Sequence, residues 1–239
     1  ASWDTVAAGL TYFTDAEDAT GVNASVPVNA LIVANAGTNV DVALSPKGTG
    51  AVLAHIPDGT PAGGDKRGNN AVDWQTSRTT NVQVASGIYS TILGGRNNTA
   101  SGNTAIVGGY QSSASSTYGV AMGFLNVVTT SGGVGLGYFT TADGVYSSSL
   151  GYKGDNKGRP SSLSIGGMCF LDTGHPFQTN IQNVSTETTD ATPTVLTGYS
   201  TTSYIYQNRM DANSAYAFKI MLIAGVTGAG DTKAWELTG

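Results

Sequence analysis

A glycine recurs every 14 residues in the middle of this chain, at Gly95, Gly109, Gly123, Gly137 and Gly151. A fixed repeat indicates stacked units that bury their apolar faces only against their neighbours, which is the pattern of a solenoid. The period is too short for a helical hairpin or a propeller blade. Each copy alternates small and apolar residues over about five positions and then passes through Ser, Thr, Asn and Gly, which is typical of a short strand followed by a turn. The repeat therefore predicts a parallel β-roll with one coil per period.

The repeated glycine has a physical role in such a roll. On a tightly turned strand, glycine supplies a positive backbone torsion or lets two backbones approach closely. A flexible Gly/Ser linker would have no reason to keep Ile, Val or Leu in register with each glycine. Because they share the 14-residue offset, we expect Ile92, Ile106, Val120 and Val134 to stack in one column facing the interior.

The repeats also resemble those of a known family. Ala85-Ser86-Gly87-Ile88-Tyr89-Ser90 precedes Gly94-Gly95, and Thr99-Ala100-Ser101-Gly102 precedes Gly108-Gly109. This pattern is similar to the head repeat of trimeric autotransporter adhesins of the YadA type. The match covers roughly Val84 to Gly154, and after Ala121 a single glycine replaces the pair. The resemblance implies a left-handed parallel β-roll in which three chains pack side by side.

The amino-acid composition limits the possible fold classes and binding partners. Only 11% of the 239 residues are charged, and 33 are glycine, so we expect almost no helix outside Ser2 to Phe13. The net charge of −5 argues against nucleic-acid binding, which needs Lys and Arg to replace counterions. The single cysteine, Cys169, cannot form an internal disulfide. There is no apolar run long enough for a membrane span and no visible signal peptide, so we expect no membrane insertion.

Both ends of the chain resemble modules of tailed-bacteriophage fibres. In the first, Val40, Val42 and Leu44 alternate, a turn is expected at Pro46-Lys47-Gly48, and a second strand resumes at Ala51-Val52-Leu53. The phrase from Asp41 to Val52 is similar to one that precedes the distal part of tail fibres and tailspikes. In the second, the segments at Ala191 to Thr197, Ala215 to Phe218 and Gly230 to Gly239 resemble a module near the ends of such fibres. In the phage-fibre family, the pattern continues beyond the position that matches Gly239. We therefore expect the chain to be a fragment or a processed product.

These observations predict an all-β, homotrimeric protein in four parts. Residues 1–60 form an N-terminal β-hairpin module of the phage-fibre type. Residues 61–83 form a loop or capping connector that contains Trp74, which either plugs the open first coil or marks where the chain crosses to a neighbouring subunit. Residues 84–177 form the YadA-like roll, with a last irregular coil at Ser162 to Gly167. Residues 178–239 form an incomplete, antiparallel module similar to a β-sandwich.

No catalytic motif is found. His55 and His175 lack metal-ligand spacing, and no nucleophile elbow, phosphate-binding loop or zinc-protease motif is present. A glycan hydrolase needs two facing carboxylates. The candidates show no diagnostic spacing, although they could converge across chains in a trimer: Asp143, Asp155, Asp172, Glu187 and Asp190. We therefore expect no enzyme activity, no cofactor and no metal.

The function that these patterns favour is attachment of a phage tail fibre to a host cell. The alternatives are a bacterial adhesin head, which would normally continue into a coiled-coil stalk with heptads, and a polysaccharide-cleaving tailspike. The expected partners are two further copies of the chain, other phage tail proteins, and a surface glycan or outer-membrane receptor of the host. The expected location is the virion. Tyr199, Tyr204 and Tyr206 are candidate receptor contacts, because tyrosine rings can stack on sugars.

The expectation of a trimer also has a physical basis. A coil of 14 residues rich in Gly, Ser, Thr and Ala encloses a core about one side chain thick, which cannot readily offset the entropy of ordering the repeats. Three rolls around a three-fold axis would seal a second apolar column between chains. The candidate interface residues are Trp74 and the aromatic residues after the repeat glycines, which are Tyr110, Phe124, Tyr138 and Tyr152. The alternative is that these rings merely flank a turn on the outer surface.

Overall fold

The computed structural model of the chain describes residues 13–18, 28–33, 39, 41, 43–167, 178–182, 200–201, 204–205, 218–225 and 232–239. All regular secondary structure in these ranges is β, as the composition predicts. The segment from Ser2 to Phe13, to which we expect any helix to be confined, lies almost wholly outside the described residues. The chain divides into two units after Gly48, and each is described by itself.

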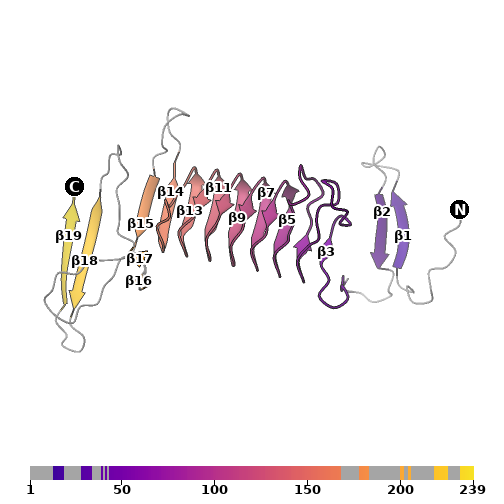
Figure 1. The fold of residues 1–239 in the computed structure, drawn as a ribbon, viewed down its shortest axis with the longest axis horizontal. Coiled ribbons are helices and arrows are strands. Elements are labelled where there is room, and N and C mark those ends of the chain that lie inside the picture. Colours follow the sequence, from indigo (N-terminus) through magenta and orange to yellow (C-terminus); the bar gives the residue numbers. More distant parts are fainter. Residues whose placement is uncertain are drawn as a thin grey trace. The chain divides into compact units, whose positions relative to one another are not determined.

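The second unit contains a parallel β-solenoid built from two sheets (Figure 1). The larger sheet stacks β3 (Val52–Leu53), β4 (Val72–Asp73), β5 (Thr91–Arg96), β7 (Ile106–Tyr110), β9 (Val120–Phe124), β11 (Val134–Tyr138), β13 (Ser148–Tyr152) and β14 (Ser162–Gly166) in chain order. The smaller sheet stacks β6 (Thr99–Ala100), β8 (Ser113–Ala114), β10 (Val127–Val128) and β12 (Thr141–Ala142). The four coils from β5 to β12 thus each contribute one long and one short strand, and the parallel β-roll predicted from the repeat is confirmed.

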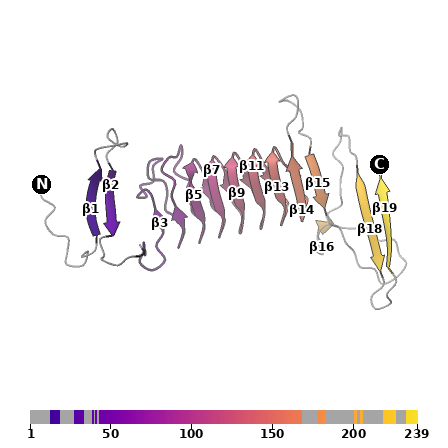
Figure 2. The ribbon, with the colours of Figure 1, turned by 180° about the vertical axis from the view of Figure 1, so that it is seen from behind.

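The last strand of the larger sheet runs in the opposite direction. β15 (Gln178–Gln182) pairs antiparallel with β14, so that Leu163 lies opposite Ile181. Seen from behind, β15 follows β14 at the end of the row of parallel strands (Figure 2). β14 itself pairs in parallel with β13, which confirms the extra coil expected at Ser162 to Gly167.

The remaining described strands form three separate hairpins. β1 (Phe13–Asp18) pairs antiparallel with β2 (Val28–Val33), β16 (Ser200–Thr201) with β17 (Tyr204–Ile205), and β18 (Lys219–Gly225) with β19 (Thr232–Thr238). β1 and β2 lie before the strands predicted at Val40 to Leu44 and Ala51 to Leu53. The C-terminal segment at Gly230 to Gly239 contains β19, whereas the segments at Ala191 to Thr197 and Ala215 to Phe218 lie almost wholly outside the described residues. The sandwich packing predicted for residues 178–239 stays a prediction.

The strand that the sequence predicts before the Pro46-Lys47-Gly48 turn is absent from the residues of this segment that the structure describes. Gly48 adopts a turn conformation with φ of 63°, but Ala43 and Leu44 are not in a strand, and Val40 and Val42 lie outside the described residues. β3 instead pairs in parallel with β4, where the amide of Val52 donates to the carbonyl of Ala71. The parallel sheet therefore begins at Val52, and the connector expected at 61–83 lies within the stack.

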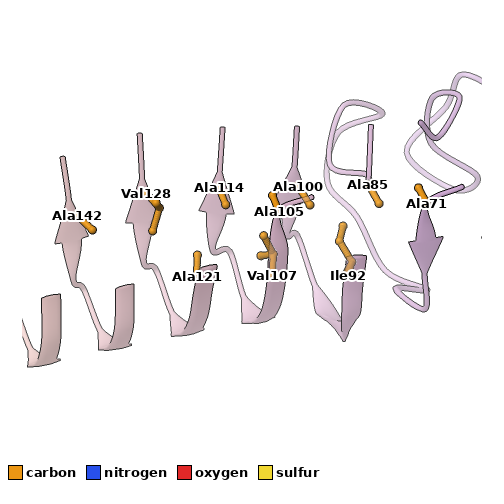
Figure 3. Packing of buried hydrophobic residues seen from close by; sticks show 10 residues of the cluster. All are labelled: Ala71, Ala85, Ile92, Ala100, Ala105, Val107, Ala114, Ala121, Val128 and Ala142. Carbon is orange, nitrogen blue, oxygen red and sulfur yellow. The ribbon is translucent and has the colours of Figure 1, made fainter. Parts of the chain in front are cut away.

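The interior of the solenoid is one side chain thick. Ile92, Val107 and Ala121 point inward from the long strands toward a column on the short strands that consists of Ala100, Ala114, Val128 and Ala142 (Figure 3). All of these side chains are fully buried. Where the larger Val128 enters this core, its methyl groups lie against Gly119, Gly133 and Gly135, so the missing side chains of the glycines make room for valine.

The predicted interior column is wrong in its register. Ile92 lies opposite Val107, not Ile106, because β5 contains one extra residue between Ile92 and Gly95. Successive strand residues point to opposite faces, so a shift of one position moves a side chain from outside to inside. Ile106, Val120 and Val134 do stack in one column, but that column points outward.

The repeat glycine is required for two reasons. Gly95, Gly109, Gly123 and Gly137 all have φ between 89° and 137°, a region that side chains with a Cβ rarely adopt. An added Cβ would also lie within 2.1 Å of the carbonyl oxygen of the repeat glycine one coil ahead. Both roles predicted for the glycine are confirmed.

A buried polar column closes the corner after each glycine. It contains Asn98, Ser112, Asn126 and Thr140, which are all fully buried. The Nδ2 of Asn98 donates to the carbonyls of Gly94 and Gly109, and its Oδ1 accepts the amide of Ser112. Each such side chain joins successive coils and satisfies backbone groups that would otherwise be buried without partners.

A charged cluster, rather than an aromatic plug, fills the N-terminal end of the stack. The Oδ2 of Asp73 lies 2.7 Å from Nε of Arg67 and 3.2 Å from Nη2 of Arg78, and all three side chains are buried. Trp74 points the other way and is 45% exposed. The prediction that Trp74 plugs the first coil is therefore wrong, because Asp73, one position earlier, takes the inward position of the strand.

Candidate interaction surface

The outward side chains of the long strands form three rows. Strand side chains alternate between faces, so outward residues are two positions apart along a regular strand and the residues between them point inward. The first row contains Val72, Thr91, Ile106, Val120, Val134, Ser148 and Leu163. The second contains Trp74, Leu93, Gly108, Met122, Leu136, Leu150 and Ile165, and the third contains Arg96, Tyr110, Phe124, Tyr138 and Tyr152. We call these three rows the long-strand face.

The long-strand face is apolar along most of its length. Leu93 and Ile165 lie near opposite ends of the second row, and their exposed fractions are 53% and 44%. Met122 and Leu136 between them are also exposed. Soluble monomers rarely expose contiguous apolar patches larger than a few hundred Å². A row of this kind on a regular, flat scaffold is typical of a surface that packs against another protein.

The third row is a ladder of stacked rings. The ring centroids of Tyr110 and Phe124 are 5.0 Å apart, those of Phe124 and Tyr138 are 4.6 Å apart, and those of Tyr138 and Tyr152 are 5.3 Å apart. Parallel in-register strands place equivalent side chains roughly 4.8 Å apart, which is a stacking distance for aromatic rings. We call these four rings the aromatic ladder. Each ring face inside the ladder is covered by its neighbour.

Two cations and an additional ring flank the ladder. The guanidinium carbon of Arg96 lies 4.5 Å from the ring centroid of Tyr110, and Nζ of Lys153 lies 5.3 Å from that of Tyr152. Both distances are within the range of a cation–π contact. Phe139 lies edge-on to Phe124 and Tyr138. The ladder is thus held in place within one chain, with its ring edges at the surface.

The structure brings together the interface candidates from the sequence. Tyr110, Phe124, Tyr138 and Tyr152 form the aromatic ladder, whereas Trp74 lies at the N-terminal end of the second row, two strands before Tyr110. The structure does not test the candidate receptor contacts. Tyr199 and Tyr206 lie outside the described residues, and only the backbone of Tyr204, in β17, is described.

The candidate carboxylates and histidine have structural partners where they are described. Oδ1 of Asp143 accepts the amide of Gly158, and Asp155 pairs with Lys157. Nδ1 of His55 lies 2.9 Å from the carbonyl oxygen of Ala62. Asp172, Glu187, Asp190 and His175 lie outside the described residues. Within the described ranges, no group of His, Cys, Asp or Glu side chains could hold a metal ion.

Other surface residues were missed by the sequence analysis. Leu93, Met122, Leu136 and Ile165 extend the apolar surface well beyond the aromatic residues. The signal was present, because each residue lies one or two positions before the repeat glycine or its equivalent. It was missed because the wrong column was assigned to the interior.

In the part of the chain that the structure describes, no helix is long and apolar enough to cross a membrane. Comparison with protein-family models, with curated proteins and with solved structures finds no match to this chain.

Proposed function

We propose that this chain is a non-enzymatic segment of a homotrimeric tail fibre of a tailed bacteriophage, and that it attaches the fibre to a glycan on the host surface. The observation that carries the proposal is the long-strand face, a continuous apolar surface on a solenoid whose own core is thin. The resemblance of residues 41–52 and 191–239 to phage-fibre modules supplies the biological setting.

The argument for a trimer starts from the size of the core. The inward column on the short strands consists of three alanines and Val128, so each coil buries little apolar area at about 25 cal/mol per Å². The larger apolar side chains, such as Leu136 and Met122, lie on the outside. Packing three long-strand faces around a three-fold axis would bury these side chains and the edges of the aromatic ladder. Parallel packing would match the rows coil by coil.

The argument for attachment follows from the trimer. Three identical chains present three copies of any binding site, and several weak contacts on a repetitive cell surface raise the overall avidity. A regular solenoid is also a stiff spacer that can hold such sites away from the virion. The buried polar column supports this rigidity, because Asn98 and Asn126 connect neighbouring coils by hydrogen bonds.

Three measurements test the proposal. Native mass spectrometry at micromolar concentration should give three times the 24.3 kDa chain mass; a well-folded monomer would contradict the trimer. The purified protein should also compete with phage for adsorption to host cells. Incubation with host capsule or lipopolysaccharide should release no reducing ends, whereas their release would favour the tailspike alternative.

A further inference from the structure

A second aromatic row lies at the other end of the long strands. Each coil has a turn residue with left-handed backbone torsion just before its long strand, and φ is between 50° and 65° at Tyr89, Thr104, Tyr118, Gly132, Tyr146 and Ser161. Tyrosine thus occupies every second coil. The three rings are 60%, 63% and 60% exposed. We call Tyr89, Tyr118 and Tyr146 the corner tyrosines.

The turn itself does not require a tyrosine. A bulky residue with φ in the left-handed region is an outlier, and Gly or Asn is favoured there. Gly132 forms the same turn between Tyr118 and Tyr146, and its amide donates to the carbonyl of Thr117 just as the amide of Tyr146 donates to that of Ser131. Residues held in sparsely populated backbone conformations cluster at active sites and ligand-binding sites.

The faces of the corner tyrosines are free of other rings. Rings two coils apart are separated by roughly 9.5 Å, so no corner ring covers the next one. In the aromatic ladder, by contrast, neighbouring centroids are 4.6 to 5.3 Å apart. In the described ranges no ring pair or side-chain hydrogen bond involves a corner tyrosine.

The ring of Tyr146 is supported from one side. A Cβ added at Gly132 would lie 2.6 Å from Cδ1 of Tyr146, so this ring packs against the turn of the preceding coil. The rest of its surface is open to solvent. A ring that is backed by the scaffold on one side and exposed on the other is suited to stacking on a flat apolar ligand face.

The residues directly before and after each corner tyrosine in the sequence are uncharged. The residues on either side of the three tyrosines are Ile88, Ser90, Thr117, Gly119, Val145 and Ser147. The hydroxyl of each tyrosine can both donate and accept a hydrogen bond. An uncharged row of exposed rings with polar tips fits a neutral ligand that offers both C–H faces and hydroxyl groups.

We propose that the corner tyrosines bind a neutral, linear polysaccharide of β-1,4-linked pyranose rings along the side of the solenoid. In an extended chain of this linkage, alternate sugars present the same face. The distance between them is slightly more than the spacing of two coils, which is roughly 9.5 Å. Each corner tyrosine would stack on every second sugar. The site lies at the opposite end of the long strands from the aromatic ladder, and it does not depend on the trimer or on the phage setting.

The test uses hexasaccharides of defined linkage. Cellohexaose, mannohexaose and chitohexaose, all β-1,4-linked, are titrated into the full chain by calorimetry, with α-1,6-linked isomaltohexaose as the comparison. We expect at least one β-1,4-linked probe to bind and isomaltohexaose not to bind. Absence of binding by all three, or equal binding of isomaltohexaose, would overturn the proposal.

Variants then assign the site. Tyr118→Gly copies the turn at Gly132, so it should keep the fold while weakening binding roughly tenfold by loss of one stacked ring. Phe139→Gly is the matched control, because Phe139 is also an exposed aromatic residue with left-handed φ, at the other corner. Its affinity should be unchanged. Unchanged binding by Tyr118→Gly, or an equal loss in both variants, would overturn the assignment, whatever the oligomeric state or host adsorption of the chain.

Discussion

The side-chain Nδ2 of Asn126 lies 2.9 Å from the carbonyl oxygen of Gly137, the repeat glycine one coil ahead. The same nitrogen donates to the carbonyl of Met122 within its own coil, and Oδ1 accepts the amide of Thr140. One buried amide therefore satisfies three backbone groups in two coils. This contact is the clearest example of how a chain with a small apolar core is held together by polar ladders.

Replacing Asn126 should be costly. Asn126→Leu keeps a similar volume but leaves buried carbonyls and an amide without partners, at about 1–3 kcal/mol for each group. Asn126→Ser copies the preceding column member, Ser112, and should cost less. Urea unfolding followed by circular dichroism measures the difference, and equal stability of Asn126→Leu and the wild type would contradict the role of this column.

Glycine substitutions should separate steric from torsional cost. A Cβ at Gly123 would lie 2.1 Å from the carbonyl oxygen of Gly137, with φ of 124°, whereas Gly48 has φ of 63° and no atom within reach. We expect Gly48→Ala to cost about 1–2 kcal/mol. Gly123→Ala should prevent folding or cost several times as much. Thermal unfolding compares them, and similar losses in both variants would mean that close coil packing contributes nothing.

The buried charges near the N-terminal end of the solenoid should be sensitive to loss of the carboxylate. Asp73→Asn leaves Arg67 and Arg78 buried without a counter-charge, which should destabilise the protein by about 3–5 kcal/mol. The partly exposed pair of Asp155 with Lys157 is the matched control, and Asp155→Asn should cost at most about 1 kcal/mol. Chemical denaturation of both variants measures the two losses in the free energy of unfolding. A loss for Asp73→Asn as small as that of the control would contradict a stabilising role of the buried Asp73 carboxylate.

Charge on the long-strand face should disrupt the proposed trimer. Leu136 and Val127 are equally exposed, at 37%, but lie on the long and the short strands respectively. Leu136→Lys should give monomers in native mass spectrometry, because three lysines would be buried together. Val127→Lys should leave the assembly intact. If both variants behave alike, the interface lies elsewhere.

Asp58 should titrate below its ordinary pKa of 3.8. The backbone amide of Thr60 donates to Oδ1 of Asp58 and is the largest cause of this lowered pKa, followed by the Thr60 hydroxyl, while the amide of Gly63 also contributes. A lowered pKa in the folded state gives stability that is present above the ordinary pKa and is lost as the pH falls through the folded value.

The titration of Asp58 can be followed directly by NMR of its carboxyl carbon. Thr60→Ala removes the hydroxyl donor but keeps the amide, so the pKa should move only part of the way back toward 3.8. A wild-type value at or above 3.8 would contradict the hydrogen-bonded turn.

The period alone determined much of the architecture. Equal spacing of Gly95, Gly109 and Gly123 forces equivalent residues of successive coils to lie side by side, because any parallel stack with one coil per period repeats its backbone geometry. The parallel β-roll, the two roles of the glycine and the alignment of Tyr110 with Phe124 followed from that spacing, whereas the all-β class followed from the composition.

Tertiary structure decided which face is inside and what closes the stack. The extra residue in β5 moves Ile92 into the interior and leaves Ile106 outside, and period counting cannot detect a bulge when both positions are isoleucine. The pairing of Asp73 with Arg67 and Arg78 depends on how a loop folds back over the first coils. The free faces of Tyr118 and Tyr146 depend on backbone torsions in their turns. Spacing determines which residues align, whereas side-chain direction and loop path depend on packing that only the folded chain provides.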